Sequence, residues 1–118
     1  MEIRLASDLA DIEAVAPLFD AYRVFYKQPS NLDASYSFLA ERWKLRESVL
    51  YFACAFGTPV GFVHLFPSFA SDRMARLWIL NDLFVDLRNR RQAIARDLMQ
   101  RAELQRFRCS QSCGGSLE

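Results

Sequence analysis

The most informative part of the chain is residues 83–96, which read Leu83-Phe84-Val85-Asp86-Leu87-Arg88-Asn89-Arg90-Arg91-Gln92-Ala93-Ile94-Ala95-Arg96. The first three end a β-rich run that begins at Arg76, and the last ones begin an amphipathic pattern that predicts a helix over residues 91–106. The first backbone N–H groups of a helix lack intrahelical partners and lie at the positive end of its dipole. This strand-to-helix junction is therefore predicted to bind an anion such as a diphosphate, which the small side chains at positions 93 and 95 let approach.

Two more β-rich runs precede this junction, residues 49–56 and residues 60–66. The turn-forming sequence Gly57-Thr58-Pro59 separates them and predicts a hairpin. Residues 67–71 are expected to form a connection, and the following run, residues 76–85, a third long strand. That strand is central to the sheet if its apolar residues are buried on both faces.

The N-terminal third is predicted to contain a strand and two helices. Residues 2–5 alternate between polar and apolar side chains, and residues 9–25 carry apolar side chains at helical spacing after a capping Ser7. Pro17 falls inside that helical pattern, so a kink or break is expected near Ala16. A second helix is expected from a cap at Asn31 or Asp33 to about residue 46.

These elements follow the order strand-helix-helix-strand-strand-strand-helix, which predicts an α/β fold of the α+β type with a mixed sheet. One domain is expected over residues 1–108. The last ten residues, 109–118, are rich in Cys, Ser and Gly and have neither helical nor strand period, so they are interpreted as an irregular tail. Its final Leu117-Glu118 is compatible with a non-native or vector-derived end.

The composition excludes several classes of protein. The chain has 118 residues, 52% of them hydrophobic, and 15 basic against 14 acidic side chains, which argues against disorder and against a bulk nucleic-acid or membrane-surface binder. Its longest apolar run is far shorter than the roughly 20 residues of a membrane span, and no signal peptide is recognised, so a cytoplasmic location is expected. Three cysteines and one histidine make no plausible zinc site, and no metal is expected.

The six residues Arg90-Arg91-Gln92-Ala93-Ile94-Ala95 resemble the Arg/Gln-x-x-Gly-x-Gly/Ala motif of the GNAT superfamily of N-acetyltransferases. Residues 18–26, 60–62 and 78–85 are similar to typical segments of that family in the same order, and the resemblance covers residues 2–107. It implies an enzyme that transfers an acetyl group from acetyl-CoA to a primary amine of an unknown small-molecule or peptide acceptor. Ala93 departs from the family's glycine, and its methyl group is expected to crowd the phosphate or to restrict the turn if a positive φ is needed.

The resemblance also implies which residues hold the coenzyme. Backbone amides of residues 92–96 would bind the pyrophosphate, arginines 88, 90 and 91 would add positive charge, and the main chain at positions 83 and 85 would contact the pantetheine arm. The alternative is an arginine-rich, solvated helix start. The predicted coenzyme-binding residues are Leu83, Phe84, Val85, Arg90, Arg91, Gln92, Ala93, Ile94, Ala95 and Arg96.

In this family an acidic residue on the same strand can help to deprotonate the attacking amine, which implies that role for Asp82. The alternative is an aspartate that orders the strand, and Asn81 is a weaker candidate on the opposite face. Tyr22, Arg23 and Tyr26 lie where the family binds its acceptor, although tyrosines at this spacing are also typical of core packing.

The single histidine and the three cysteines are expected to have structural roles or none in catalysis. A lone histidine on a strand, His64, is usually a packed sheet residue. Cys54 is expected to be a small buried hydrophobe, and Cys109 and Cys113 to oxidise or cross-link if the tail is exposed. Nucleic-acid binding by the arginines of residues 88–108 is not favoured, because acidic residues interrupt them and no aromatic platform adjoins them.

The family continues with a fifth strand and a helix that bears a catalytic tyrosine, and neither is recognised after residue 107. The chain is therefore interpreted as truncated before the fifth strand, which leaves the edge of the strand at residues 76–85 open. Two copies are expected to close each other's sheets as a homodimer. A second interpretation of the function follows: an inactive fragment that binds coenzyme A weakly or forms only a structural oligomer.

Overall fold

The computed structural model describes residues 1–105 and 107–109. Three helices pack on a five-stranded sheet with the order β1-β2-β3-β4-β5, in which every pair is antiparallel except the parallel pair β4–β5. The strands are β1 (Glu2–Leu5), β2 (Val49–Ala55), β3 (Thr58–Ala70), β4 (Ala75–Val85) and β5 (Phe107–Cys109), and the helices are α1 (Leu9–Phe25), α2 (Leu32–Lys44) and α3 (Ile94–Ala102). The predicted α+β fold class and element order are confirmed.

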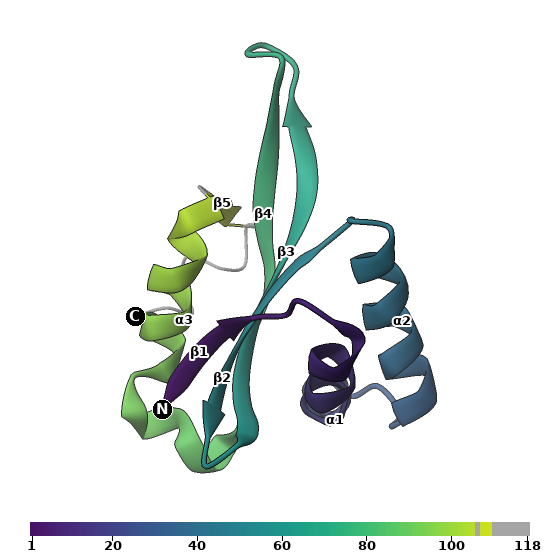
Figure 1. Cartoon of the computed structure of the whole chain (residues 1–118), viewed down its shortest axis with the longest axis vertical. Coiled ribbons are helices and arrows are strands. Elements are labelled where there is room, and N and C mark those ends of the chain that lie inside the picture. Colours follow the sequence, from purple (N-terminus) through teal and green to yellow (C-terminus); the bar gives the residue numbers. More distant parts are fainter. Residues whose placement is uncertain (106, 110–118) are drawn as a thin grey trace.

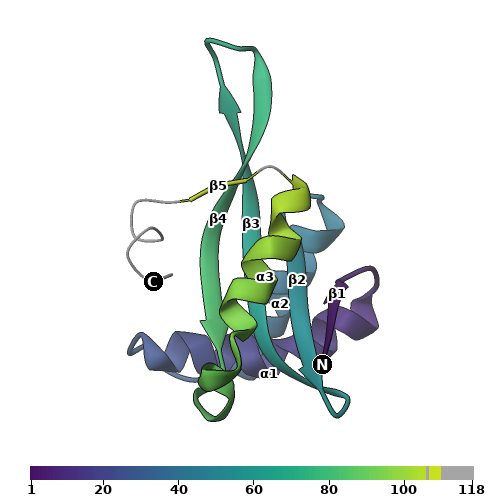
Figure 2. The same cartoon turned by 90° about the vertical axis from the view of Figure 1, so that its left-hand side faces the viewer.

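The helices cover both faces of the sheet, α1 and α2 on one face and α3 on the other (Figures 1 and 2). Strand residues alternate between the two sides, as a pleated strand requires. Phe52 and Phe62 pack toward α1 and α2 in one core, whereas Val63, Leu65 and Leu80 pack toward α3 in the other. The single sheet therefore supports two separate cores, and α3 reaches the sheet directly after β4.

The helix α1 runs unbroken through Pro17, so the helix does not break near Ala16, one of the two predicted outcomes. Pro17 and Glu13 both lie on the exposed side of the helix, where water can satisfy the carbonyl that a proline leaves without a donor. The cap also differs from the prediction. Asp8 accepts a hydrogen bond from the backbone N–H of Asp11 at 2.9 Å, whereas the backbone N–H of Ser7 donates to the Asp11 carboxylate.

The hairpin of β3 and β4 is longer than the sequence indicated. Residues 67–70, predicted as a connection, continue β3, and the two strands project as an arm beyond the helices (Figure 1). Beyond Leu65 no β2 residue pairs with β3, so Pro67 lies on a free edge, where proline is tolerated in a strand. Two bulky apolar side chains, Phe69 and Met74, are exposed on this arm.

The helix predicted for residues 91–106 is interrupted. Residues 87–92 form the 3-10 helix η1 (Leu87–Gln92), α3 begins only at Ile94, and a short 3-10 turn, η2 (Glu103–Gln105), follows it. Ala93 separates η1 from α3 because its φ of 58° lies in the left-handed region and ends the first helical run. Leu104, one of the apolar residues in the helical pattern predicted for residues 91–106, is exposed.

A fifth strand is present, so the expectation that none follows residue 107 is wrong for residues 107–109. The strand β5 pairs with residues 78–80 of β4, with Phe107 opposite Trp78 and packed against the core under α3. It forms because β4 offers an unpaired edge, which a local sequence pattern does not reveal. In the described part of the chain, residues 75–77 and 81–85 of β4 keep an edge without a neighbouring strand. The tail over residues 110–118, with Cys113 and the side chain of Cys109, lies outside the described residues.

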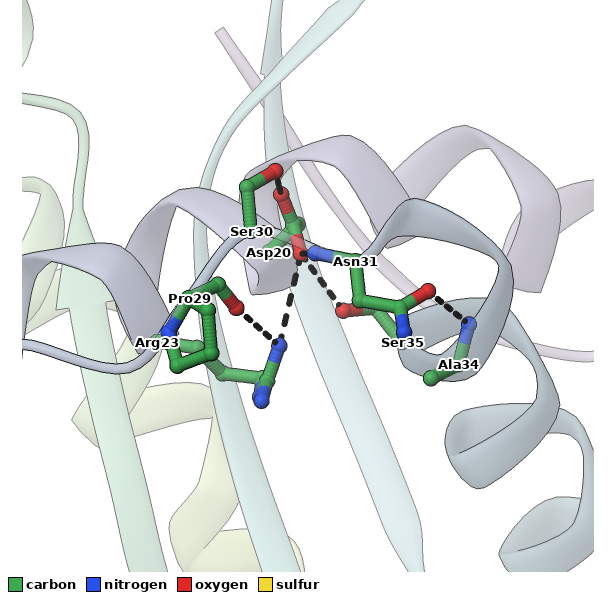
Figure 3. Close-up of polar contacts among 7 residues, drawn as sticks. All are labelled: Asp20, Arg23, Pro29, Ser30, Asn31, Ala34 and Ser35. Carbon is green, nitrogen blue, oxygen red and sulfur yellow. Dashed lines mark hydrogen bonds and ion pairs between the residues drawn. The ribbon is translucent and has the colours of Figure 1, made fainter.

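The connection between α1 and α2 is fastened by Asp20 (Figure 3). Its buried carboxylate accepts hydrogen bonds from the Ser30 hydroxyl at 2.5 Å, the Asn31 backbone N–H at 2.8 Å and the Ser35 hydroxyl at 2.8 Å. The bond from Ser30, followed by that from Asn31, outweighs burial and lowers the pKa of Asp20. The cluster fixes the last turns of α1, which carry the aromatic side chains described below.

Replacing Asp20 with alanine is expected to lower the free energy of unfolding by about 3 kcal/mol at pH 7, because three buried donors lose a charged acceptor. The lowered pKa means that this contribution is complete above the pKa of the unfolded carboxyl and is lost as the pH falls through the folded one. Urea unfolding at pH 7 and at acid pH measures both effects. The exposed Asp33→Ala is the control, and equal stability of Asp20→Ala and the unmodified chain at pH 7 would contradict the account.

Candidate active site

The open edge of β4 carries free backbone groups at alternate residues. The backbone N–H of Asp86 donates to the carbonyl of Val60 at 2.8 Å, which makes these two a hydrogen-bonded antiparallel pair. Because such pairs alternate along a ladder, Phe84 also bonds to β3, whereas Leu83 and Val85 direct their N–H and C=O groups away from it. These are the two positions that the sequence predicted to offer main-chain contacts.

A cavity of about 280 Å³ adjoins this edge. It is formed where the end of α1 meets the junction between β4 and α3, which lies about 60 residues later in the sequence. Its walls are made by Phe25, Tyr26, Leu83, Phe84, Val85, Arg90 and Ala95. Five of these seven residues belong to the predicted coenzyme-binding set, and Tyr26 belongs to the predicted acceptor-binding set.

Arg90 lies in the wall of the cavity and is held there by two kinds of contact. Its Nε–H donates to the carbonyl oxygen of Val85 at 2.9 Å, and its guanidinium lies 5.0 Å from the ring centroid of Phe25 and 5.5 Å from that of Phe84. A planar cation stacked on aromatic rings is a favourable arrangement. Arg88, in contrast, extends into solvent beside Asp86. Both arginines are exposed, but only the Arg90 side chain is held against the protein by these contacts.

The start of α3 carries the backbone amides that an α-helix leaves without an intrahelical partner. The first hydrogen bond within the helix runs from the N–H of Asp97 to the carbonyl of Ala93 at 3.1 Å, so the amides of residues 94–96 precede any intrahelical partner. Ala93 is exposed and supplies no side-chain cap. An external acceptor could therefore bind these amides. The side chain of Ile94 is fully buried, so its part in binding is limited to its backbone.

Gly61 of β3 determines how closely α3 approaches the sheet. A Cβ atom at this position would lie 3.1 Å from a methyl carbon of Ile94 and 3.2 Å from one of Leu98. Any larger residue would push the helix away, since both side chains are fully buried. Gly61 therefore sets the position of the helix start relative to the end of β4.

Ala93 adopts the positive φ that the glycine of the family motif would allow, and its methyl group is strained there by about 1–2 kcal/mol. Ala93→Gly is expected to raise the free energy of unfolding by about 0.5–1 kcal/mol, because glycine removes the strain at a smaller cost in chain entropy. Urea unfolding measures the change. The matched control is Ala95→Gly, which lies in regular helix and is expected to lose about 1 kcal/mol. A destabilised Ala93→Gly would contradict the strain.

Asp82 lies in a buried polar cluster next to a bulge in β4. His64 pairs with Asp82 and Leu65 with Leu80, so Asn81 is the extra residue of the bulge. Because of the bulge, the exposed Asn81 side chain turns toward Asp82 and does not point to the opposite face of the sheet, as the sequence had predicted. Its Nδ2 donates to Asp82 Oδ1 at 3.1 Å, and the Tyr22 hydroxyl donates to the same oxygen at 2.6 Å.

Burial and hydrogen bonding act in opposite directions on this cluster. Burial raises the pKa of Asp82, but the contacts with His64 and Tyr22 outweigh it and hold the pKa below the ordinary value. For Tyr22, burial and the bond to Asp82 both raise the pKa strongly. At neutral pH, Asp82 is therefore a carboxylate and Tyr22 a neutral hydroxyl donor.

The predicted site residues separate into two groups in space. Tyr22 and Asn81 meet at Asp82, and Tyr26 lines the cavity. Arg23 is turned elsewhere: its Nη1 donates to the Pro29 carbonyl at 3.1 Å in the α1–α2 connection (Figure 3). The side chains of Arg91 and Gln92 are not among those the structure describes.

His64 is the residue that sequence reasoning set aside. Its ring is fully buried, and its Nδ1 lies 3.4 Å from Asp82 Oδ2, too far for a well-formed hydrogen bond. Its Nε2 has no partner within residues 1–105 and 107–109. What could have identified His64 is its place opposite Asp82 on the neighbouring strand, but this follows only once the pairing of β3 and β4 is known. Cys54, in contrast, is a buried free thiol, as predicted.

Metal binding and membrane spanning are two further properties on which the structure bears. Among the described residues, no group of three His, Cys, Asp or Glu side chains is arranged to hold a metal ion. In that same part of the chain no helix has the length and apolar character needed to cross a bilayer.

Comparisons with known proteins agree with the geometry. The chain is 47% identical over 85 residues to the uncharacterized N-acetyltransferase YhfO of Bacillus subtilis (strain 168), a match that covers 72% of this chain and 56% of that protein. A crystal structure of a probable acetyltransferase is 37% identical, with a TM-score of 0.85 over 99% of this chain and 83% of that one. No family model matches the sequence.

A more distantly similar structure is that of a protein with acetyl-CoA. The crystal structure of a predicted acetyltransferase from Clostridium acetobutylicum with acetyl-CoA has a TM-score of 0.72 over 92% of this chain and 78% of that one. At 12% identity, this likeness shows the fold alone. The chain spans about half the length of the curated relatives that it matches.

Proposed function

Because this chain belongs to the GNAT family of N-acetyltransferases, we propose that it binds acetyl-CoA at the junction of β4 and α3 and transfers the acetyl group to a primary amine. One observation carries the proposal. The amides of residues 94–96 lack intrahelical partners and lie beside the cavity lined by Ala95. Such a helix start is suited to a pyrophosphate, because several N–H groups and the helix dipole act on one anion.

The cavity and the edge of β4 continue the proposed pyrophosphate site from the start of α3 along the strand. The pyrophosphate would lie on the amides of α3, and the pantetheine arm would run along β4, where Leu83 and Val85 direct backbone groups outward. Arg90 supplies positive charge at the junction while keeping its contact with Val85. The absence of a side-chain cap at Ala93 supports this fit, since no internal acceptor competes for the amides.

Acetyl-CoA supplies a thioester whose carbonyl carbon an amine can attack. The nitrogen forms a bond to this carbon, the C–S bond breaks, and its electron pair leaves with sulfur, which solvent protonates. An ammonium has no lone pair for this attack, so a proton must leave the nitrogen. Asp82 is the proposed acceptor, acting through water. As a carboxylate at neutral pH, it attracts the ammonium and takes one proton through water before the attack, which leaves the nitrogen a lone pair. The nitrogen loses a second proton to solvent as the C–S bond breaks, and the product is a neutral amide.

Calorimetry with acetyl-CoA and a thiol-release assay with a panel of primary amines test the two parts of this proposal. Heat of binding together with amine-dependent thiol release supports an acetyltransferase. Binding without release with any amine supports the alternative, a chain that holds the coenzyme but lacks turnover. Absence of binding contradicts the proposed site. The cytoplasm, where acetyl-CoA is available, is the proposed location.

A homodimer through the edge of β4 is a second part of the proposal, placed at residues 81–85, the open stretch next to the cavity, because β5 covers residues 78–80. The same edge is proposed for the pantetheine arm, so the two uses compete. Sedimentation is expected to give a dimer without coenzyme and a smaller dimer fraction when acetyl-CoA is added. A monomer at all concentrations contradicts this association.

A further inference from the structure

The cluster around Asp82 contains a histidine that the packing of the fold does not require. His64 lies among aromatic rings, 4.4 Å from the ring centroid of Phe66 and 6.3 Å from that of Phe19. An aromatic or aliphatic side chain would fill this space without leaving two buried nitrogen atoms lacking a proper hydrogen bond. Buried polar atoms of this kind are costly, and they occur more often at functional positions than elsewhere.

The two oxygens of Asp82 are approached from different elements. On one side Oδ1 accepts the hydroxyl of Tyr22, from α1, at 2.6 Å, and on the other side Oδ2 faces His64 Nδ1, from β3, at 3.4 Å. The carboxylate is therefore held between a helix and a neighbouring strand. Its own strand is bulged at this point, which leaves Asn81 exposed directly beside it.

We propose that Tyr22 and His64 are positioning residues for Asp82: the Tyr22 hydroxyl holds one carboxylate oxygen, the His64 ring faces the other, and together they present the carboxylate at the bulge of β4. This inference rests on the proposed function, in which Asp82 takes the proton of the acceptor amine. Tyr22 then has a role different from the substrate contact that the sequence predicted. It acts through Asp82 and leaves Tyr26 to the cavity.

No other described charge competes for this assignment. The titratable groups that face Asp82 are Tyr22 from α1 and His64 from β3, with Tyr26 behind Tyr22 at a ring distance of 5.1 Å. The opposite face of β4 packs under α3 through apolar side chains. A change in the titration of Asp82 can therefore be assigned to these partners.

Two variants remove the contacts and keep the rings. Tyr22→Phe deletes only the hydroxyl and retains the packing against Phe62 and Phe84, and His64→Phe replaces the imidazole by a ring of similar size. The control is Tyr36→Phe, a half-buried tyrosine in the same core whose hydroxyl does not contact Asp82. In each full-length protein, the carboxyl of Asp82 is titrated by carbon NMR and the pH profile of kcat/KM is measured.

In Tyr22→Phe, the titration of Asp82 and the acid limb of kcat/KM are expected to move together to higher pH by about one unit, because the ionised form loses a donor. A smaller shift in the same direction is expected for His64→Phe, and none for the control. Packing alone would leave both curves in place. If one variant does not fold, the other gives the same readout.

Unshifted titrations in the variants that fold overturn the inference, whatever their activity. Shifted titrations support the hold on Asp82 even if no amine is acetylated, and that result overturns the proposed function instead. A shift in the titration without a shift in the profile of an active enzyme overturns the link between the carboxylate and catalysis. The NMR readout thus separates the two failures.

Discussion

Replacing Ala95 with glutamate is expected to lower the affinity for acetyl-CoA about 100-fold while the fold stays intact. Ala95 lines the cavity in the first turn of α3, beside the unpaired amides. A carboxylate about 5 Å from a phosphate charge costs about 3 kcal/mol near a protein surface, which corresponds to about 100-fold in affinity. A negative charge at a helix N-terminus stabilises the helix, so the free energy of unfolding is not expected to fall.

The matched control is Ala95→Gln, which adds the same volume without the charge. Ala95→Gln is expected to lower the affinity for acetyl-CoA less than Ala95→Glu does, because it only fills part of the cavity and adds no charge. Calorimetry at low and at high salt measures both variants, because the charge effect is screened by ions and the steric effect is not. Equal affinities for the two variants would show that the anion does not lie at this helix start.

Asp82→Asn is expected to reduce kcat about 100-fold or more, the usual contribution of a positioned proton acceptor. Asparagine keeps an oxygen for the Tyr22 hydroxyl but takes up no proton. Affinity for acetyl-CoA is expected to be unchanged, since Asp82 is not among the residues that line the cavity. Thiol release at saturating coenzyme, together with calorimetry, separates the two effects.

The control is Asp72→Asn, an exposed carboxylate on the turn between β3 and β4. It is expected to keep full activity. Because the pKa of Asp82 lies below its ordinary value, activity of the unmodified protein is expected to persist as the pH falls until the carboxylate is protonated. Full activity of Asp82→Asn would assign the deprotonation to another group or to solvent.

The fold was predictable from the sequence because its elements have clear periods. The β-rich runs of β2 and β3, the helical spacing in α1 and α2 and the strand-to-helix junction all appear at their predicted places, although β3 extends further than its run. The errors fall where tertiary structure decides. Pro17 is accommodated because it faces solvent, and the three residues of β5 have no period of their own but find a free edge on β4.

The site was predictable in part. The junction motif identified the segment that forms the cavity, and the concern about a positive φ at Ala93 is confirmed. The place of His64 beside Asp82 was missed because a position on one strand says nothing about its cross-strand neighbour. The bulge at Asn81 shifts the register by one residue, which sequence periodicity does not reveal. Arg23 matched the family by position, but it binds the α1–α2 connection.

The most direct test of the central claim is the perturbation of backbone amide NMR signals when coenzyme A is added to the isotope-labelled chain. The account predicts that the largest shifts occur at the amides of residues 94–96 and at Leu83 and Val85, with smaller ones at Phe25 and Tyr26. Unchanged signals at the start of α3, with the largest shifts on another surface such as the α1–α2 groove around Tyr36, would contradict it.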